Sequence, residues 1–119
     1  MVTADEIRSI ALSLPETEEQ DHWEKPSFRV RSKIYAVIQP DGVSLVIKTT
    51  KEDRAAYTTM DSDVYQMPDS FQNLAFMIVR MDRVHPEECR NMLTLAWSLV
   101  APKKVVKAFN EKGQELKQD

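Results

Sequence analysis

The sequence predicts an α+β fold, in which an antiparallel β-sheet of about five strands packs one face against N- and C-terminal helices. Two observations support this fold class. Apolar residues recur with the 3.6-residue period of a helix near both ends of the chain, and they alternate with a period of two across residues 28–49. Runs of strands flanked by helices are typical of an antiparallel sheet with helices on one side. Because the chain has 119 residues, we expect a single domain over residues 1–119.

The first helix is expected to begin at a capping box and to end at a proline. Thr3 and Glu6 have the spacing of this motif, which satisfies backbone N–H groups of the first turn. Pro15 cannot continue a helix and ends it. The polar segment 16–25 is expected to be an irregular connection that is ordered only where Trp23 docks. The apolar stripe of this helix consists of Ile7, Ile10, Ala11 and Leu14.

Period-two alternation predicts three paired strands in the middle of the chain. A two-residue turn at positions 31–32 would pair Phe28 with Tyr35. That register would leave Ile34 on the side of Arg29, whereas a longer turn would change the faces. The three strands are expected over residues 27–30, 33–38 and 43–49.

The second half of the chain predicts a short helix, two further strands and two more helices. Thr50 starts the short helix, which is expected to run to about Tyr57. The second of the two strands is nearly continuous in apolar residues, which indicates a central position with both faces covered. Gly113 is expected to end the last helix. These elements are expected over residues 50–57, 63–68, 73–81, 85–101 and 103–113.

The long helix carries an apolar face that would complete the core. Its apolar residues recur at helical spacing from Cys89 to Val100. Pro86 occupies the first helical position, which suits a residue without a backbone N–H. The side chains expected to be buried are Leu14, Phe28, Ile47, Phe76, Ile78, Leu93 and Trp97.

Charge is segregated along the chain, although the net charge is only −3. Residues 1–24 carry seven acidic side chains and one basic one, whereas residues 25–54 carry seven basic and three acidic ones. A negative net charge disfavours general affinity for nucleic acid, but a segregated basic segment can form a local patch. The first residues do not resemble a signal peptide, and the longest apolar run, 74–79, is too short to span a bilayer. We expect a soluble cytoplasmic protein that makes no contact with a membrane.

The sequence contains no recognisable catalytic motif, and we expect that the protein is not an enzyme. Two glycines, two histidines and one cysteine supply neither a phosphate-binding loop nor a zinc site, so no cofactor or metal is expected. Cys89 lies on the apolar helix face, which favours an inert buried thiol over a nucleophile at the helix start. His85 is expected to cap that helix. The acidic segment 16–24 would suit a hard cation, but it lacks the ligand spacing of a calcium loop and is better explained as a surface loop.

The remaining candidate is the basic segment around the first predicted turn. Arg29 and Arg31 would project from the same face of their strand, because side chains alternate along a strand. Lys33 follows the turn, Lys48 lies on the third predicted strand, and Arg54 adds positive charge in the short helix. Two interpretations stay open at this point. The segment is either a hairpin that contacts phosphates or a solvated sheet edge whose charges prevent aggregation.

A series of short motifs runs through most of the chain in a regular order. It consists of His22, Pro26, Phe28-Arg29-Val30, Lys33-Ile34-Tyr35-Ala36, Lys48, Ala96-Trp97 and Ala101-Pro102-Lys103-Lys104. In these motifs the chain resembles the MmcQ/YjbR family. The resemblance implies a frataxin-like α+β fold and a small bacterial cytoplasmic protein. The family is commonly described as DNA-binding, through a proposed double-wing arrangement of the sheet hairpins.

The chain departs from the family pattern at two places. Family members usually have two glycines where this chain has Arg31 and Ser32, so the charge at the hairpin tip is higher. Phe71 stands in place of a tryptophan that often precedes the fifth strand. A frataxin-like fold also suggests iron binding by acidic residues of the first helix. That helix offers only Asp5 and Glu6, so we expect no iron site.

The resemblance and the charge pattern together predict a DNA-binding protein. It would contact the phosphate backbone of double-stranded DNA weakly and without strong sequence specificity. The alternative is a protein-interaction module with no nucleic-acid or catalytic role, whose sheet edge or terminal helix recruits a protein partner. The candidate DNA-binding residues are Arg29, Arg31, Lys33, Lys48, Lys103 and Lys104.

Overall fold

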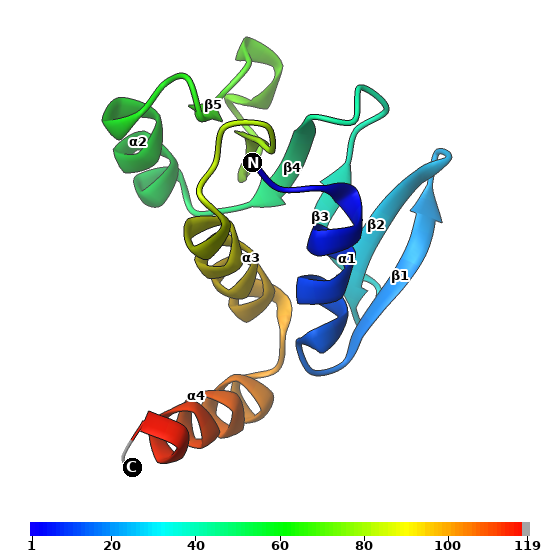
Figure 1. The fold of residues 1–119 in the computed structure, drawn as a ribbon, viewed down its shortest axis with the longest axis vertical. Coiled ribbons are helices and arrows are strands. Elements are labelled where there is room, and N and C mark those ends of the chain that lie inside the picture. The colour runs from blue at the N-terminus through cyan, green and yellow to red at the C-terminus, as the bar shows by residue number, and fades with distance from the viewer. Residues whose placement is uncertain (118–119) are drawn as a thin grey trace.

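The computed structural model describes residues 1–117, which form four α-helices and one six-stranded sheet (Figure 1). The predicted α+β class is confirmed. Within the described residues, no helix combines the length and the apolar character that crossing a membrane would require. The helices are α1 (Ala4–Ser13), α2 (Lys51–Met60), α3 (Pro86–Val100) and α4 (Lys103–Lys117), with a 3₁₀ turn η1 (Asp69–Phe71). The strands are β1 (Thr17–His22), β2 (Lys25–Val30), β3 (Lys33–Ile38), β4 (Ser44–Lys48), β5 (Tyr65–Gln66) and β6 (Phe76–Arg80).

The sheet is antiparallel and has the strand order β1-β2-β3-β4-β6-β5. The predicted number of five strands was one too low, because the segment 16–25 contains β1 and is not an irregular connection. Glu19 of β1 forms an ion pair with Arg8 of α1 at 2.7 Å. The hydroxyl oxygens of Thr17 and Tyr35 lie 3.0 Å apart, within hydrogen-bond distance. Pairing with a neighbouring strand and these two contacts therefore override the polar composition of β1.

Two-residue turns close both hairpins in the first half of the sheet. Trp23 and Glu24 join β1 to β2 with φ angles of 54° and 66°. Arg31 and Ser32 join β2 to β3 with φ angles of 50° and 71°. Two consecutive positive φ angles are typical of a type I′ turn, whose twist matches that of paired strands. Neither turn contains a glycine or an asparagine, so each hairpin forms against a backbone cost of about 1–2 kcal/mol per left-handed residue.

An irregularity in the pairing of β2 with β3 decides which residues face the helices. Phe28 pairs with Ala36, so the expected pairing with Tyr35 was wrong. The next pair is Arg29 with Ile34, which means that two residues of β3 oppose one of β2. Tyr35 and Ala36 are consequently both buried in the core. Ile34 remains on the side of Arg29, as expected.

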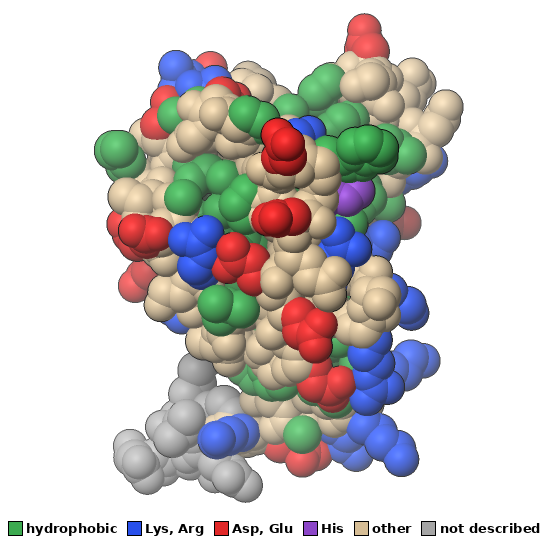
Figure 2. All heavy atoms as spheres, turned by 90° about the vertical axis from the view of Figure 1, so that its right-hand side faces the viewer, with side chains coloured by type: hydrophobic (Ala, Val, Ile, Leu, Met, Phe, Trp, Pro, Cys, Tyr) green, Lys and Arg blue, Asp and Glu red, His purple; other side chains and the backbone are tan. Residues whose placement is uncertain are grey.

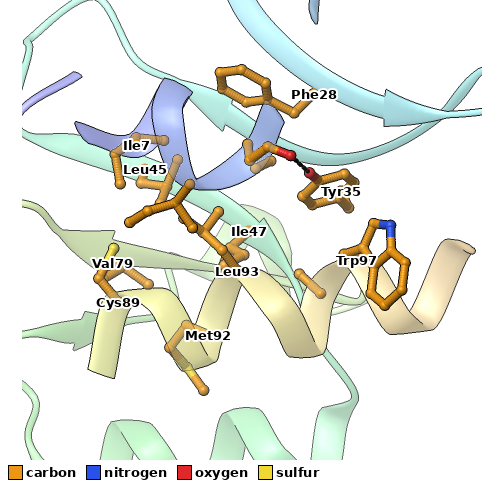
Figure 3. Close-up of a cluster of buried hydrophobic side chains, with 14 of the residues drawn as sticks. Ile7, Phe28, Tyr35, Leu45, Ile47, Val79, Cys89, Met92, Leu93 and Trp97 are labelled. Carbon is orange, nitrogen blue, oxygen red and sulfur yellow. Dashed lines mark hydrogen bonds between the residues drawn. The ribbon is translucent and has the colours of Figure 1, made fainter. Parts of the chain in front are cut away.

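Helices α1 and α3 cover one face of the sheet, and the hydrophobic core lies between them and the strands (Figures 1 and 3). The indole Nε1 of Trp97 in α3 donates to the carbonyl oxygen of Pro15 at 2.8 Å, which ties α3 to the segment after α1. Phe109 of α4 packs against this indole, with ring centres 5.0 Å apart. The expected core residues that the structure confirms as buried are Leu14, Phe28, Ile47, Leu93 and Trp97.

The expectation of burial was wrong for Phe76 and Ile78 of β6, which are half-buried. Met77 and Val79 alternate with them and fill the core. Phe76 and Ile78 point to the sheet face that α1 and α3 leave uncovered. The continuous apolar run of β6 therefore reflects one fully buried face and one partly covered face.

The predicted helix starts are confirmed by their caps. The side chains of Thr3 and Thr50 accept hydrogen bonds from the backbone N–H groups of Glu6 and Asp53, at 3.2 and 3.1 Å. The ends of two helices differ from the prediction. Helix α2 reaches Met60, and α4 continues past Gly113 to Lys117. A single interior glycine costs a helix only about 1 kcal/mol, which its helix-favouring neighbours offset.

Candidate functional site

We name the side of the sheet opposite α1 and α3 the open face. Cross-strand pairing places Arg29 beside Ile34 and Lys48 beside Phe76 on this side. Strand β3 separates β2 from β4, so the backbones of the two cationic residues lie roughly 10 Å apart across the sheet. Two of the six predicted site residues, Arg29 and Lys48, therefore share the open face. Its side chains include Glu18, Lys25, Arg29, Ile34, Val37, Val46, Lys48, Phe76 and Ile78.

Both cations of the open face are held by local contacts. Arg29 Nε donates to the hydroxyl oxygen of Ser27 at 3.1 Å, and Nη2 donates to the carbonyl oxygen of Asp21 at 3.5 Å. Lys48 Nζ lies 5.2 Å from the centre of the Phe76 ring, which is within range of a cation–π interaction. Neither arrangement neutralises the charge. Each cation keeps N–H groups that can donate hydrogen bonds to an anionic ligand.

The other four predicted cations lie at one end of the molecule. Arg31 Nε forms an ion pair with Glu16 at 2.9 Å. The neighbouring Pro15 lines a groove together with Lys104 of α4. These contacts bring the turn between β2 and β3 to the same end as the start of α4. Figure 2 shows Lys and Arg side chains gathered at the lower right of the view, next to α4. We name this group, Arg31, Lys33, Lys103 and Lys104, the basic end.

The acidic residues that precede the hairpin are divided among several positions. Glu19 is paired with Arg8, and Glu16 is paired with Arg31. Glu18 lies opposite Arg29 on the open face. The ion pair with Glu16 offsets part of the charge of Arg31, and both side chains remain exposed to solvent. Among the described residues, no ion pair involves Lys33, Lys48, Lys103 or Lys104.

The open face contains a shallow apolar groove of about 180 Å³. The segment that follows η1 partly covers it, and Arg54 of α2 holds this segment in place. Arg54 is 5% exposed, and its guanidinium donates to the carbonyl oxygens of Phe71 and Phe76, each at 3.0 Å. It also donates to those of Gln72 and Leu74. The groove is lined by His22, Ile34, Val37, Val46, Phe71, Leu74 and Phe76.

Sequence reasoning missed this role of Arg54 and treated the residue as surface charge. The sequence offers no signal for it, because the accepting carbonyl groups belong to a segment 17 to 22 residues later. A buried guanidinium is stabilised only when its donors are satisfied, and here backbone carbonyl oxygens satisfy them. Arg54 is thus a structural residue and does not belong to the basic end.

Trp23 projects from the tip of the β1–β2 hairpin. Its side chain is 84% exposed, so the expectation that Trp23 docks was wrong. Its ring stands edge-to-face with that of His22, with centres 6.4 Å apart. Since His22 lines the groove, the indole stands next to one end of it. The sequence marks this residue only as an aromatic side chain in a polar segment.

The structure gives Cys89 and His85 structural positions. Cys89 is fully buried, and burial raises the pKa of its thiol to about 11, which favours the protonated form. His85 caps α3 as expected, because its Nδ1 accepts from the Glu87 N–H at 3.2 Å. Among residues 1–112, whose side chains the structure describes, no three His, Cys, Asp or Glu side chains are grouped to hold a metal ion.

Comparisons with known proteins agree with this architecture. A model of the YjbR family matches residues 12–99. The crystal structure of Deinococcus radiodurans protein DR2400, described as a DUF419 domain, is similar to this chain with a TM-score of 0.75 and 24% sequence identity. The similarity covers 94% of this chain and 88% of the other. Among curated proteins, none matches the sequence.

Proposed function

The chain belongs to the YjbR family, and from that premise and its cluster of cations we propose that it binds DNA through the phosphate backbone. The observation that carries the proposal is that two segments distant in the sequence lie at the same end of the molecule. Lys33 follows the β2–β3 turn, whereas Lys103 and Lys104 begin α4. All three side chains are exposed. Phosphate groups are the ligands that such exposed, clustered cations favour.

The six predicted residues contribute unequally to this proposal. Lys33, Lys103 and Lys104 are the strongest contacts, because no carboxylate among the described residues neutralises them. Arg29 and Lys48 extend the positive surface onto the open face. Arg31 must exchange its ion pair with Glu16 for a phosphate, so its net contribution is smaller.

Weak and largely non-specific binding follows from this chemistry. Lysine side chains on a turn and at a helix start contact phosphates but read no bases. Three to five phosphate contacts give a slope of about −3 to −4.5 when log K is plotted against log salt. The expected Kd is on the order of 10⁻⁴ to 10⁻⁶ M at physiological salt, because binding is mostly electrostatic.

The test is a titration of labelled duplex DNA at several salt concentrations with wild type and the Lys33→Ala/Lys103→Ala/Lys104→Ala variant. The substitutions remove three phosphate contacts, so the salt slope should become shallower by about 2 to 3. A variant with Arg29→Ala/Arg31→Ala/Lys33→Ala should show a smaller change, because Arg31 is already paired.

A matched control removes three exposed cations from other parts of the surface. The variant Lys51→Ala/Arg83→Ala/Arg90→Ala has the same net charge as the first variant. It should retain the slope of the wild type. Equal losses in the two variants would mean that only net charge matters. No binding of DNA, duplex or single-stranded, by the wild type at low salt would overturn the proposal.

A protein-interaction module is the second candidate, and one feature favours it. An apolar groove of about 640 Å³ lies between α4 and the end of α1, with Pro15, Val105 and Phe109 in its walls. Recruitment through the sheet edge is less favourable, because β1 presents charged residues that discourage strand addition. This candidate leads if the wild type binds no DNA at low salt.

The proposal includes the absence of catalysis. The high pKa of the buried Cys89 and the capping role of His85 leave both groups without a reactive setting. A bound small molecule that copurifies with the protein and is detected by native mass spectrometry would contradict this part.

A further inference from the structure

We propose that the DNA recognised by this protein is single-stranded, with unpaired bases held on the open face while the neighbouring cations contact phosphates. The inference builds on the proposed function, because it assumes that the cations of this region bind phosphate. The inference further specifies that the DNA is single-stranded and that the open face recognises its bases. The side chains that would contact bases are His22, Trp23, Phe71, Leu74 and Phe76.

The first argument is the apolar character of the groove. A duplex keeps its bases stacked inside and presents only phosphates and groove edges, so an apolar surface gains nothing from it. Unpaired bases expose faces that stack on aromatic side chains and pack against aliphatic ones. Phe76 and Phe71 are half-buried in the groove wall, and Leu74 is 49% exposed at its rim. The groove therefore suits bases and not the backbone of a duplex.

The second argument is the position of Trp23. A large aromatic side chain exposed to water is unfavourable, and Trp23 is 84% exposed. Exposed aromatic side chains are the platforms on which unpaired bases stack. The indole stands beside His22, at one end of the groove. A base that leaves the groove at this end would meet the face of the indole.

The third argument is the charge around the groove. Lys48 lies over the edge of the groove at Phe76, and Arg29 pairs with Ile34 of the groove wall. Lys25 lies opposite His22 on the same face, so cations occur at both ends of the groove. This arrangement is complementary to a chain that carries one negative charge per nucleotide. A second copy of the protein would instead bring the same cations to one interface, which disfavours self-association through the open face.

The experiment measures the anisotropy of a labelled oligothymidylate of about ten nucleotides, a length within the usual range of single-strand sites. The same label on a duplex of equal length is titrated in parallel at the same salt concentration. We expect the single strand to bind about tenfold or more tightly, because stacking adds to the phosphate contacts. Binding should also change the fluorescence of Trp23.

The critical variant is Trp23→Ser, which changes an exposed side chain and should leave the fold intact. It should weaken single-strand binding about tenfold and leave duplex binding unchanged. Phe76→Leu removes the aromatic ring but keeps an apolar side chain, and it should give a second loss of single-strand affinity. The control is Met60→Ser, which removes an apolar residue 61% exposed on α2, outside the groove. It should change neither affinity.

Each outcome separates this inference from the proposed function. Equal affinity for both forms, reduced by substitutions at the basic end but not by Trp23→Ser, would overturn the inference and keep the proposed function. No binding of either form at low salt would overturn both. Equal competition by poly-glutamate of the same charge would show that the groove recognises anionic chains without bases, which also overturns the inference.

Discussion

The two faces of the sheet are built from similar residues but differ in what covers them. On β4 and β6, Leu45 pairs with Val79 under α3, and both side chains are fully buried. One position along each strand, Val46 pairs with Ile78 on the open face, and both are half-buried. The composition of the two faces is thus alike at these positions. The helices, and not the strand residues, decide which face becomes the core.

This difference separates stability from binding. The apolar side chains of the core face are removed from water by α1 and α3, so their burial stabilises the fold. The apolar side chains of the open face keep part of their surface exposed and gain less on folding. That remaining surface is available to a ligand. Substitutions on the core face should therefore lower stability, whereas substitutions on the open face should weaken ligand binding.

The largest effect is expected for Trp97→Ala on the core face. Trp97 is fully buried, holds Pro15 through its Nε1 and packs against Phe109. Its truncation removes a large apolar contact and leaves a cavity, so the free energy of unfolding should fall by about 3–5 kcal/mol. Chemical denaturation measures this quantity. A loss below about 1 kcal/mol would contradict the role of α3 as the main cover of this face.

An intermediate effect is expected for Arg54→Met, which tests how the open face is partly covered. The substitution keeps a long apolar stem but removes the donors to four backbone carbonyl oxygens. Because some of these oxygens regain water when the segment after η1 loosens, the loss of stability should be about 2–3 kcal/mol. Denaturation measures the loss, and hydrogen exchange at residues 72–75 reports the loosening.

The matched variant Arg54→Lys distinguishes charge from geometry. An ammonium group has three donors and no fork, so it should recover part of the stability that Arg54→Met loses. Complete recovery would show that positive charge alone holds the segment. No increase in hydrogen exchange for Arg54→Met would contradict the role of Arg54 in covering the open face.

The sequence predicts the core face better than the open face, for a physical reason. Helical periodicity and period-two alternation indicate which face of a helix or strand is buried against the rest of the fold. They place Leu93 and Trp97 correctly. They cannot distinguish two apolar faces of one strand, which is why Phe76 was expected to be fully buried. The register irregularity at Tyr35 depends on the contacts of this residue with Thr17 and the core. No local sequence pattern predicts this irregularity.

The sequence identifies the charged residues of the candidate site, but not how the fold places them relative to one another. The lysines of the basic end are visible in the sequence, but their placement at one end of the molecule depends on Trp97 and Pro15, whose contact fixes α3 and the start of α4 near the end of α1. The acidic segment was misread, because polar composition is a poor guide to an edge strand that is fixed by pairing. Once β1 is recognised, Glu16 and Glu19 become partners of Arg31 and Arg8.

The smallest effect compares one chemical change on the two faces. Val79→Thr places a hydroxyl group in the core, where burial without a hydrogen bond should cost about 1–3 kcal/mol. Val46→Thr makes the same change one position from Leu45, the cross-strand partner of Val79, but on the open face. The new hydroxyl group keeps access to water there, so the loss should be below about 0.5 kcal/mol. Valine and threonine have nearly equal shape and volume, so the comparison isolates the effect of the helices that cover the core face.

Paired denaturation curves give the difference in the free energy of unfolding with little error, because the m-values should agree. Similar losses at both positions would mean that the open face is as dry as the core, and that the segment held by Arg54 seals the groove against any ligand.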